Sequence, residues 1–248
     1  MACMVDIHCH LLPAVDDGSD SWETSVEMCR MAASDGIRHS VATPHANDQF
    51  VYHRQQHAAS LERLQQAVGA APSLSLGCDF HFSYDNVQAA IINPGDYAIG
   101  SSGYLLIEFS DYALPPFLSD ALGRLEGAGL TSVVTHPERN LLLQREPEQV
   151  LKLAQQGCII QVTASALTGR FGERAQRVAR WLLERDAVHV LASDAHDLRH
   201  RPPVLSAGRE AAAAICGADV ARALVEDNPQ AIVSNQPLPY FPEPTMKA

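Results

Sequence analysis

Val5-Asp6-Ile7-His8-Cys9-His10 is a short apolar strand that ends in two imidazoles. His8 and His10 are two residues apart, so their side chains project to the same face of a strand. Imidazole is the commonest protein ligand of divalent transition metals. Two surface histidines also occur at this spacing by chance, so a metal site is predicted only if other parts of the chain supply more ligands.

Short strands alternate with amphipathic helices along the rest of the chain, which predicts parallel strand pairing and an α/β architecture. A helix is expected over 21–34, with Asp20 and Glu23 at capping-box spacing and Gly36 at its end. The region before Tyr104 is expected to be looser. The seven expected strands cover 5–10, 37–43, 74–82, 104–109, 131–135, 158–162 and 188–192.

An open doubly wound sheet and a barrel both fit this pattern. A Gly-rich phosphate loop does not follow the first strand, which disfavours the dinucleotide-binding open sheet. Potential metal ligands instead fall at or near C-terminal strand ends, which converge on one face of a TIM-like barrel. Seven strands predict a barrel with one unit fewer than usual. These strand-end residues are His8, His10, His45, Asp79, Glu108, His136, Asp194 and His196.

Such a mixture of imidazoles and carboxylates suits Mn²⁺, Fe²⁺ or Zn²⁺, and it exceeds what one ion needs. We therefore expect a cluster of two or three divalent ions. Glu108 follows four apolar residues on its strand, where an unpaired carboxylate is costly, and it is the candidate bridge between ions. For Asp17, Asp79 and Asp194, capping of the following helix is the competing interpretation.

Ions about 3.5 to 4 Å apart can hold a hydroxide and stabilise both the attacking and the leaving oxygen at phosphorus. Hydrolysis of a phosphate monoester therefore fits the ligand set. Arg139 and Arg201 follow two of the histidines and are placed to bind phosphate oxygens in bidentate fashion. For Arg139, an ion pair with Glu138 or Glu146 is the alternative.

The composition limits the class of protein and of partner. The 248 residues are 46% hydrophobic and 19% charged, as in a soluble globular protein. A net charge of −11 argues against nucleic acid as the main partner. We expect no transmembrane segment, since no apolar run reaches the roughly 18 residues that a membrane span needs. Six cysteines without a CxxC pair predict buried free thiols, and the N-terminal sequence predicts a cytoplasmic protein.

One motif indicates a different phosphatase chemistry. Cys216 and Arg222 have the Cys-x5-Arg spacing of cysteine-based tyrosine phosphatases. That mechanism needs a phosphate-binding loop and an activated thiolate. The flanking residues are helical in character and Asp219 would repel phosphate, so we reject this interpretation.

Six motifs together resemble the polymerase and histidinol phosphatase (PHP) superfamily: Asp6-Ile7-His8-Cys9-His10, Val15-Asp16-Asp17-Gly18, Thr43-Pro44-His45, Leu106-Ile107-Glu108-Phe109, His136-Pro137-Glu138-Arg139 and Ala192-Ser193-Asp194-Ala195-His196. With Arg201-Pro202-Pro203, the set is similar to the bacterial manganese-dependent protein-tyrosine phosphatases of capsule and exopolysaccharide gene clusters. The motifs keep the family's order over nearly the whole chain.

The resemblance implies a distorted (β/α)7 barrel of the PHP type over residues 1–236, followed by a loosely held Pro-rich tail over 237–248. It implies a three-metal centre and phosphate-binding, catalytic roles for Arg139 and Arg201. Where the family has Gly-x-Glu, this chain has Gly77-Cys78-Asp79. Asp79 then binds one ion instead of bridging two, or His81 contributes. The implied ligands are His8, His10, Asp17, His45, Asp79, Glu108, His136, Asp194 and His196.

The implied function is a cytoplasmic, manganese-dependent protein-tyrosine phosphatase. Its expected substrate is phosphotyrosine on a bacterial tyrosine kinase of polysaccharide export, attacked at phosphorus by metal hydroxide. Two alternatives stay open: a small-molecule phosphatase such as histidinol-phosphate phosphatase, and a non-catalytic, metal-stabilised binding module. His45 and His196 are candidate proton donors only if the metal ions leave an imidazole free.

Overall fold

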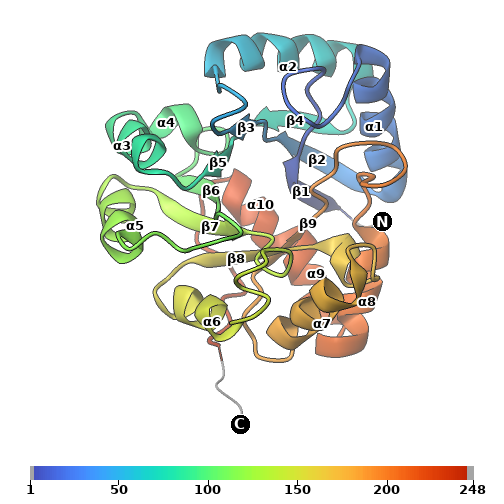
Figure 1. Cartoon of the computed structure of the whole chain (residues 1–248). Helices are drawn as coiled ribbons and strands as arrows, with labels where there is room; N and C mark the ends of the chain where they lie inside the picture. The colour runs from blue at the N-terminus through green and yellow to red at the C-terminus, as the bar shows by residue number, and fades with distance from the viewer. Residues whose placement is uncertain (1–2, 245–248) are drawn as a thin grey trace.

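The computed structural model describes residues 3–244, in which parallel strands surround the centre and most helices lie outside them (Figure 1). The strands of this part of the chain form two parallel sheets, in the orders β1-β2-β4 and β3-β5-β6-β7-β8-β9. Their bounds are β1 Met4–Cys9, β2 Ile37–Ala42, β3 His45–Ala46, β4 Ser73–Leu76, β5 Asp79–His81, β6 Tyr104–Glu108, β7 Thr131–Thr135, β8 Ile159–Thr163 and β9 Val190–Ala192.

The two sheets are arcs of one ring. The expected strand over 74–82 is divided into β4 and β5, and the short strand β3 follows the end of the strand expected over 37–43. β2 passes into β3 at Thr43-Pro44, where proline has no N–H to donate to a neighbouring strand. β4 passes into β5 at Gly77-Cys78. The backbone pairing continues across these breaks, since the N–H of Asp79 donates to the carbonyl of Pro44 at 3.1 Å. Seven expected strands thus become nine within residues 3–244, through the additional strand β3 and the division of 74–82.

The first and last strands close the ring. A parallel bridge joins Cys9 to Ala195, just beyond β9. The N–H of Asp194 also donates to the carbonyl of His8 at 2.8 Å. The prediction of an α/β fold with parallel, barrel-like strands is confirmed, and the carboxyl ends of the strands face one common mouth.

Most helices cover the outside of this ring, whereas α10, Asn228–Val233, lies within it in this view, and its Ile232 packs in the same apolar cluster as Leu106 of β6 (Figure 1). A short 3₁₀ turn, Ala164–Ala166, follows β8, and a π-helical turn, Ala223–Asp227, lies between α9 and α10. The α-helices are α1 Trp22–Asp35, α2 Arg54–Val68, α3 Tyr84–Ile92, α4 Pro94–Tyr97, α5 Leu118–Gly127, α6 Glu148–Gln155, α7 Gly172–Leu183, α8 Ser206–Cys216, α9 Ala218–Arg222 and α10 Asn228–Val233.

The cap of α1 differs from the expected one. Ser21 is the N-cap, and its hydroxyl accepts a hydrogen bond from the N–H of Thr24 at 3.2 Å. Asp20 instead accepts from the Thr24 hydroxyl, so the predicted capping role of Asp20 is wrong. Gly36 ends the helix with φ at 98°, as predicted, because that left-handed conformation favours glycine.

Helix α3 lies in a region that we expected to be looser. Its N-cap is Ser83, whose hydroxyl accepts from the N–H of Asn86. Val87 and Ala90 are buried three residues apart on one face. The serine before an apolar periodic run was therefore a usable helix signal.

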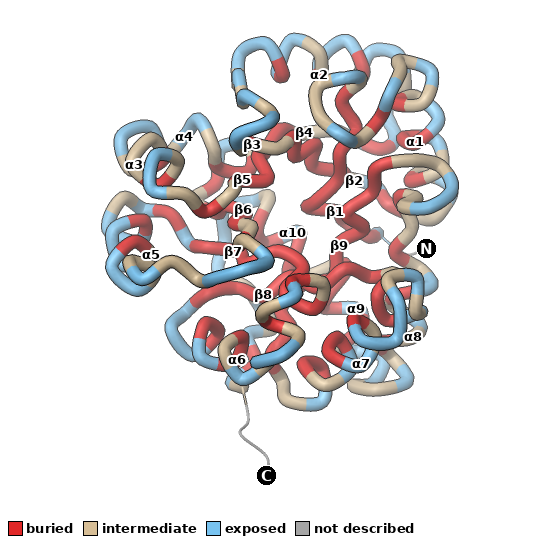
Figure 2. Tube along the Cα trace, viewed as in Figure 1, coloured by how far each residue is buried: buried red, intermediate tan, exposed pale blue. Residues whose placement is uncertain are grey.

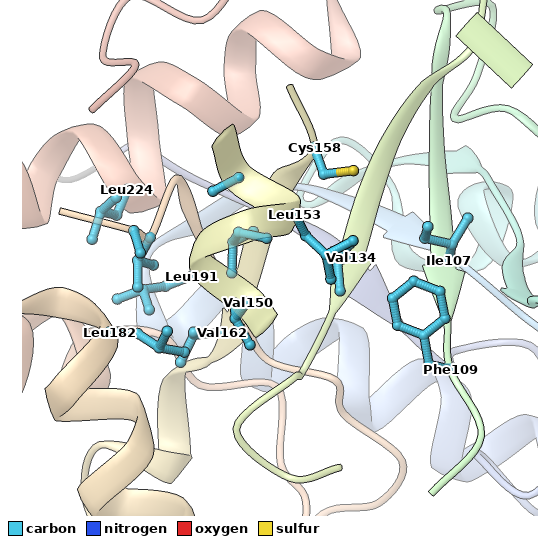
Figure 3. Packing of buried hydrophobic residues seen from close by; sticks show 14 of the residues in the cluster. Ile107, Phe109, Val134, Val150, Leu153, Cys158, Val162, Leu182, Leu191 and Leu224 are labelled. Atoms are coloured by element: carbon cyan, nitrogen blue, oxygen red, sulfur yellow. The ribbon is translucent and has the colours of Figure 1, made fainter. Parts of the chain in front are cut away.

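The strands are buried, whereas the helices expose their outer faces (Figure 2). One apolar cluster lies between the strands and the helices and includes Ile107, Val134, Leu153 and Leu182 (Figure 3). A second cluster, which includes Leu106, fills the inside of the ring. Alternation along β6 therefore turns Glu108, two residues beyond Leu106, toward the inside at the mouth.

The Pro-rich tail is attached to the base of the barrel as far as it is described. The Asn228 amide donates to the carbonyl of Tyr240 at 2.6 Å, and the N–H of Tyr240 donates back at 3.0 Å. The ring of Phe241 lies 4.7 Å from that of His189. The expectation of a loosely held tail is wrong for these residues, and 245–248 lie outside the described part. Within residues 3–244, no helix is both long and apolar enough to cross a membrane.

Candidate metal centre

The predicted ligands gather at one mouth of the ring. Each of them belongs to at least one group in which imidazole nitrogens and carboxylate oxygens lie within 4.8 Å of one another. His81 belongs to none of the groups found among residues 3–244. The four groups are His10, Asp17, His45 and His196; His8, His136 and Asp194; His8, His10 and Asp79; and His45, Asp79 and Glu108.

His8 is oriented from behind by Gln161. Its Nδ1 lies 2.9 Å from Oε1 of Gln161, an acceptor, which leaves Nε2 facing the cluster. This Nε2 is 3.3 Å from Oδ1 of Asp194 and 3.5 Å from Oδ2 of Asp79. Burial lowers the pKa of His8, but these two carboxylates outweigh burial and raise the pKa to about 9. A cation bound here would displace that proton.

His10 is oriented by Asp16, a residue to which the sequence had assigned no role. Nδ1 of His10 lies 2.8 Å from Oδ2 of Asp16, and that oxygen also accepts from the N–H of His45. Burial raises the pKa of Asp16, but His10 outweighs it and lowers the pKa to about 2. A carboxylate behind an imidazole is the usual outer support of a metal ligand.

The turn after β1 brings Asp16 and Asp17 over His10. A Cβ atom at Gly18 would collide with the Cβ and the carbonyl oxygen of His10, so only glycine fits there. Asp17 is half exposed, and its Oδ1 lies 3.2 Å from Nε2 of His45 and 3.4 Å from Nε2 of His196. Its competing role as a helix cap is not observed, since Ser21 caps α1.

The surroundings of Asp79 show whether the mouth of the ring suits bound cations. It is completely buried, and its Oδ2 lies 3.1 Å from Nδ1 of His45 and 3.5 Å from Nε2 of His8 without a well-aligned hydrogen bond to either. Oδ1 of Asp79 and Nε2 of His196 also make no well-aligned hydrogen bond. Buried polar atoms without partners are costly, and these donors are the ones that divalent transition metals bind. The residues present therefore fit bound divalent cations.

Asp79 reaches two sides of the cluster although it is one methylene shorter than glutamate. It belongs to the group with His8 and His10 and to the group with His45 and Glu108. Burial raises the pKa of Asp79, but His8 and His45 outweigh it and hold the pKa well below its usual range. Ser83 caps the following helix, so Asp79 is not a helix cap.

Glu108 faces two imidazoles with its two oxygens. Oε1 lies 3.5 Å from Nε2 of His136, and Oε2 lies 3.9 Å from Nδ1 of His45. Burial, followed by the repulsion of Asp79, raises the pKa of Glu108 to about 7. A cation bound beside Glu108 would favour the ionised form of this carboxyl group.

Two residues of the centre adopt a left-handed backbone conformation without being glycine. The φ angle is 34° at His136 and 50° at Asp194. Such conformations cost on the order of 1 kcal/mol each and cluster at functional sites.

Both predicted arginines converge on Asp194. Nη1 of Arg139 and Nη2 of Arg201 donate to Oδ2 of Asp194. The guanidinium of Arg139 also lies 4.3 Å above the ring of Phe171. The alternative pairing with Glu138 is not observed, because that carboxylate instead accepts from a backbone N–H of β8 at 3.0 Å.

Asp6 fixes the loop that carries Asp194. Its carboxylate accepts from the N–H of Ser193 at 2.9 Å and from the Ser193 hydroxyl, which in turn accepts from the N–H of Ala195. The sequence analysis did not assign a role to Asp6. A carboxylate within a buried strand was nevertheless a signal, since buried charges need partners.

Cys216 and Arg222, which have the Cys-x5-Arg spacing, do not form a phosphate-binding loop in the structure. Cys216 ends α8, and its thiol donates to the carbonyl of Ala212. Burial raises the pKa of this thiol. Arg222 pairs with Asp227 at 2.7 Å, so neither residue is arranged for thiolate chemistry.

The sequence matches, over residues 4–234, the protein family described as capsular polysaccharide synthesis, CpsB/CapC. It is 32% identical over 204 residues to tyrosine-protein phosphatase YwqE of Bacillus subtilis strain 168, covering 80% of this chain and 79% of YwqE. It is 29% identical over 242 residues to tyrosine-protein phosphatase CpsB of Streptococcus pneumoniae, covering 94% of this chain and 99% of CpsB.

Solved structures show the same likeness. The structure matches one from a study of YwqE and of S. pneumoniae CpsB, described as unique metal-dependent tyrosine phosphatases, with a TM-score of 0.90 and 28% identity over 98% of this chain and 100% of that chain. A TatD homologue from Escherichia coli shares only the fold, with a TM-score of 0.52 and 14% identity over 96% of this chain and 100% of that chain.

Proposed function

This chain belongs to the capsular polysaccharide synthesis family CpsB/CapC, and from that premise we propose that it is a metal-dependent protein-tyrosine phosphatase. One observation carries the proposal: two arginines border a mouth where imidazoles and carboxylates converge, and the buried carboxylate of Asp79 makes no well-aligned hydrogen bond there. We assign the activity to a single barrel domain over residues 1–236.

We propose that the mouth holds two or three divalent ions, with manganese preferred and iron or zinc as alternatives. When bound, such ions polarise the phosphoryl oxygens and activate water for attack at phosphorus. The mixed nitrogen and oxygen donors suit all three metals. The proposed ligands are His8, His10, Asp17, His45, Asp79, Glu108, His136, Asp194 and His196.

Arg139 and Arg201 bind the non-bridging oxygens of the phosphate. Both guanidinium groups already point at the edge of the cluster through Asp194. A phosphate dianion offers more acceptor oxygens than one carboxylate, and guanidinium binds phosphate in bidentate fashion. Phe171 keeps Arg139 in place through a cation–π contact while its hydrogen-bond partner changes.

Asp16 and Gln161 keep the imidazoles of His10 and His8 in one orientation during the reaction. The leaving group needs little help from a general acid. The phenol of tyrosine has a pKa near 10, so the phenolate leaves more readily than an alkoxide.

We further propose that the substrate is phosphotyrosine on a bacterial tyrosine kinase of polysaccharide export. The family description and the names of the relatives support this choice. The cysteines are free thiols, which suits a reducing compartment, and we propose the cytoplasm.

The test is turnover by metal-stripped protein reloaded with Mn²⁺, with a phosphotyrosine peptide and histidinol phosphate as competing substrates. We expect faster hydrolysis of the peptide, and a large loss of activity in His10→Ala and Arg139→Ala. The control is His53→Ala, at an exposed histidine outside the cluster. Faster turnover of histidinol phosphate would overturn the proposed substrate. Metal binding without turnover of either compound would indicate a non-catalytic binding module.

A further inference from the structure

A cavity of about 350 Å³ opens beside the candidate metal centre, on the side of β6 and β7. Its lining includes Glu108, His136 and Arg139 of the candidate site together with the aromatic residues Phe109 and Tyr112. This volume lies within the roughly 300–1,000 Å³ range of small-molecule sites. The cavity is therefore continuous with the place where a phosphate would meet Arg139.

Part of the lining of this cavity is aromatic. Phe109 is nearly buried, and its ring packs against that of Phe82 at 5.3 Å between centroids. Tyr112 is 87% exposed. Single exposed apolar side chains are common, so the exposure of Tyr112 gains meaning only from its position on the wall of this cavity. Aromatic side chains there supply flat contact area with few rotatable bonds.

Hydrogen bonds hold this aromatic wall at a fixed place relative to the guanidinium. Asn140, the residue after Arg139, donates from Nδ2 to the carbonyls of Phe109 at 3.2 Å and Ser110 at 3.0 Å. Asp111 accepts from the N–H of Leu141 at 3.0 Å. The loop after β6 and the loop after β7 are thus joined, and the cavity between them is preformed.

We propose that this cavity receives the phenyl ring of phosphotyrosine, and that Tyr112 is a specificity-determining residue. The inference rests on the proposed function and deepens it. The phosphate lies at Arg139, and the ring lies against Tyr112, because both residues line the same cavity. Alkyl phosphates lack the ring and gain nothing from Tyr112.

The experiment compares Tyr112→Ala, Tyr112→Phe and the control Tyr84→Ala in the Mn²⁺-loaded full chain. Tyr84 is 60% exposed on α3 and does not line the cavity. The two readouts are KM for a phosphotyrosine peptide and the inhibition constant of inorganic phosphate. We expect Tyr112→Ala to raise KM for the peptide about 3- to 10-fold, because one aromatic contact with the substrate ring is lost. The inhibition constant of inorganic phosphate should stay unchanged, because phosphate has no ring.

Tyr112→Phe keeps the ring and should remain near the wild type, as should Tyr84→Ala. An unchanged KM in Tyr112→Ala, or an equal rise in KM and in the phosphate constant, would overturn the inference while leaving the phosphatase intact. A wild-type protein that does not hydrolyse phosphotyrosine would overturn the proposed function and the inference with it. Thermal unfolding of each variant checks that the exposed substitutions leave the fold unchanged.

Discussion

Nε2 of His8 lies 3.3 Å from Oδ1 of Asp194, although one residue lies in the first strand and the other follows the last. The contact crosses the junction at which the ring of strands closes, next to the bridge between Cys9 and Ala195. The geometry of the metal centre therefore depends on the pairing of β1 with the end of β9.

Asp6 is expected to stabilise that junction. Asp6→Ala leaves the N–H and the hydroxyl of Ser193 without their acceptor, so we expect a loss of about 2–3 kcal/mol in the free energy of unfolding. Urea denaturation measures it. Asp6→Asn keeps one acceptor and should lose less, and the exposed Asp20→Ala should match the wild type. An equal stability of Asp6→Ala and wild type would contradict this role.

Asp16 and Asp17 are adjacent in sequence, but their substitution should affect metal binding in different ways. Asp16→Asn weakens the orientation of His10, so we expect metal affinity to fall about 10- to 100-fold with the same number of ions bound at saturation. Asp17→Asn removes a proposed ligand and should lower the number of ions bound. Metal titration followed by elemental analysis separates the two, and identical behaviour of the variants would contradict the distinction.

Removal of the metal should lower thermal stability. The buried carboxylate of Asp79 makes no well-aligned hydrogen bond, so bound cations should stabilise the folded protein. An ion present at a hundredfold excess over its Kd contributes about 2.7 kcal/mol. We expect the unfolding temperature to fall after chelation and to recover with Mn²⁺. A chelator that leaves the unfolding temperature unchanged would contradict metal binding at this mouth.

His189 should make the protein sensitive to acid. Burial lowers the pKa of His189 to about 4, whereas an unfolded histidine has a pKa near 6.5. Between these values the unfolded state binds the proton and the folded state does not, so stability falls as the pH drops from 6.5 to 4. The loss reaches about 3 kcal/mol at the lower limit.

The matched variant is His189→Asn. Nδ1 of His189 accepts from the N–H of Ile160 at 3.1 Å, and an asparagine carbonyl can take over that acceptor without titrating. The variant should lose less stability than the wild type between pH 7 and pH 4.5, measured by urea denaturation. The same pH dependence in both proteins would show that another group is responsible.

The sequence predicted the strand-end ligands because strand periodicity and the common direction of parallel strands bring those positions together. It did not identify Gln161 or Asp16 as supporting residues, because each acts through a contact that only the folded chain creates. The end of the second strand before Pro44 was predicted, but the two-residue strand β3, His45–Ala46, was missed because it is too short to show a hydrophobic period. The division of 74–82 at Gly77-Cys78 was also missed, since apolar residues occur on both sides of it.

The closure of the ring between β1 and the residues just after β9 also has a consequence for biosynthesis. His8, His10 and Asp17 leave the ribosome early, but Asp194 and His196 follow only after most of the chain has been made. A nascent or truncated chain thus carries an incomplete coordination set. The full set of proposed ligands can therefore come together only after His196 has been made and the ring has closed.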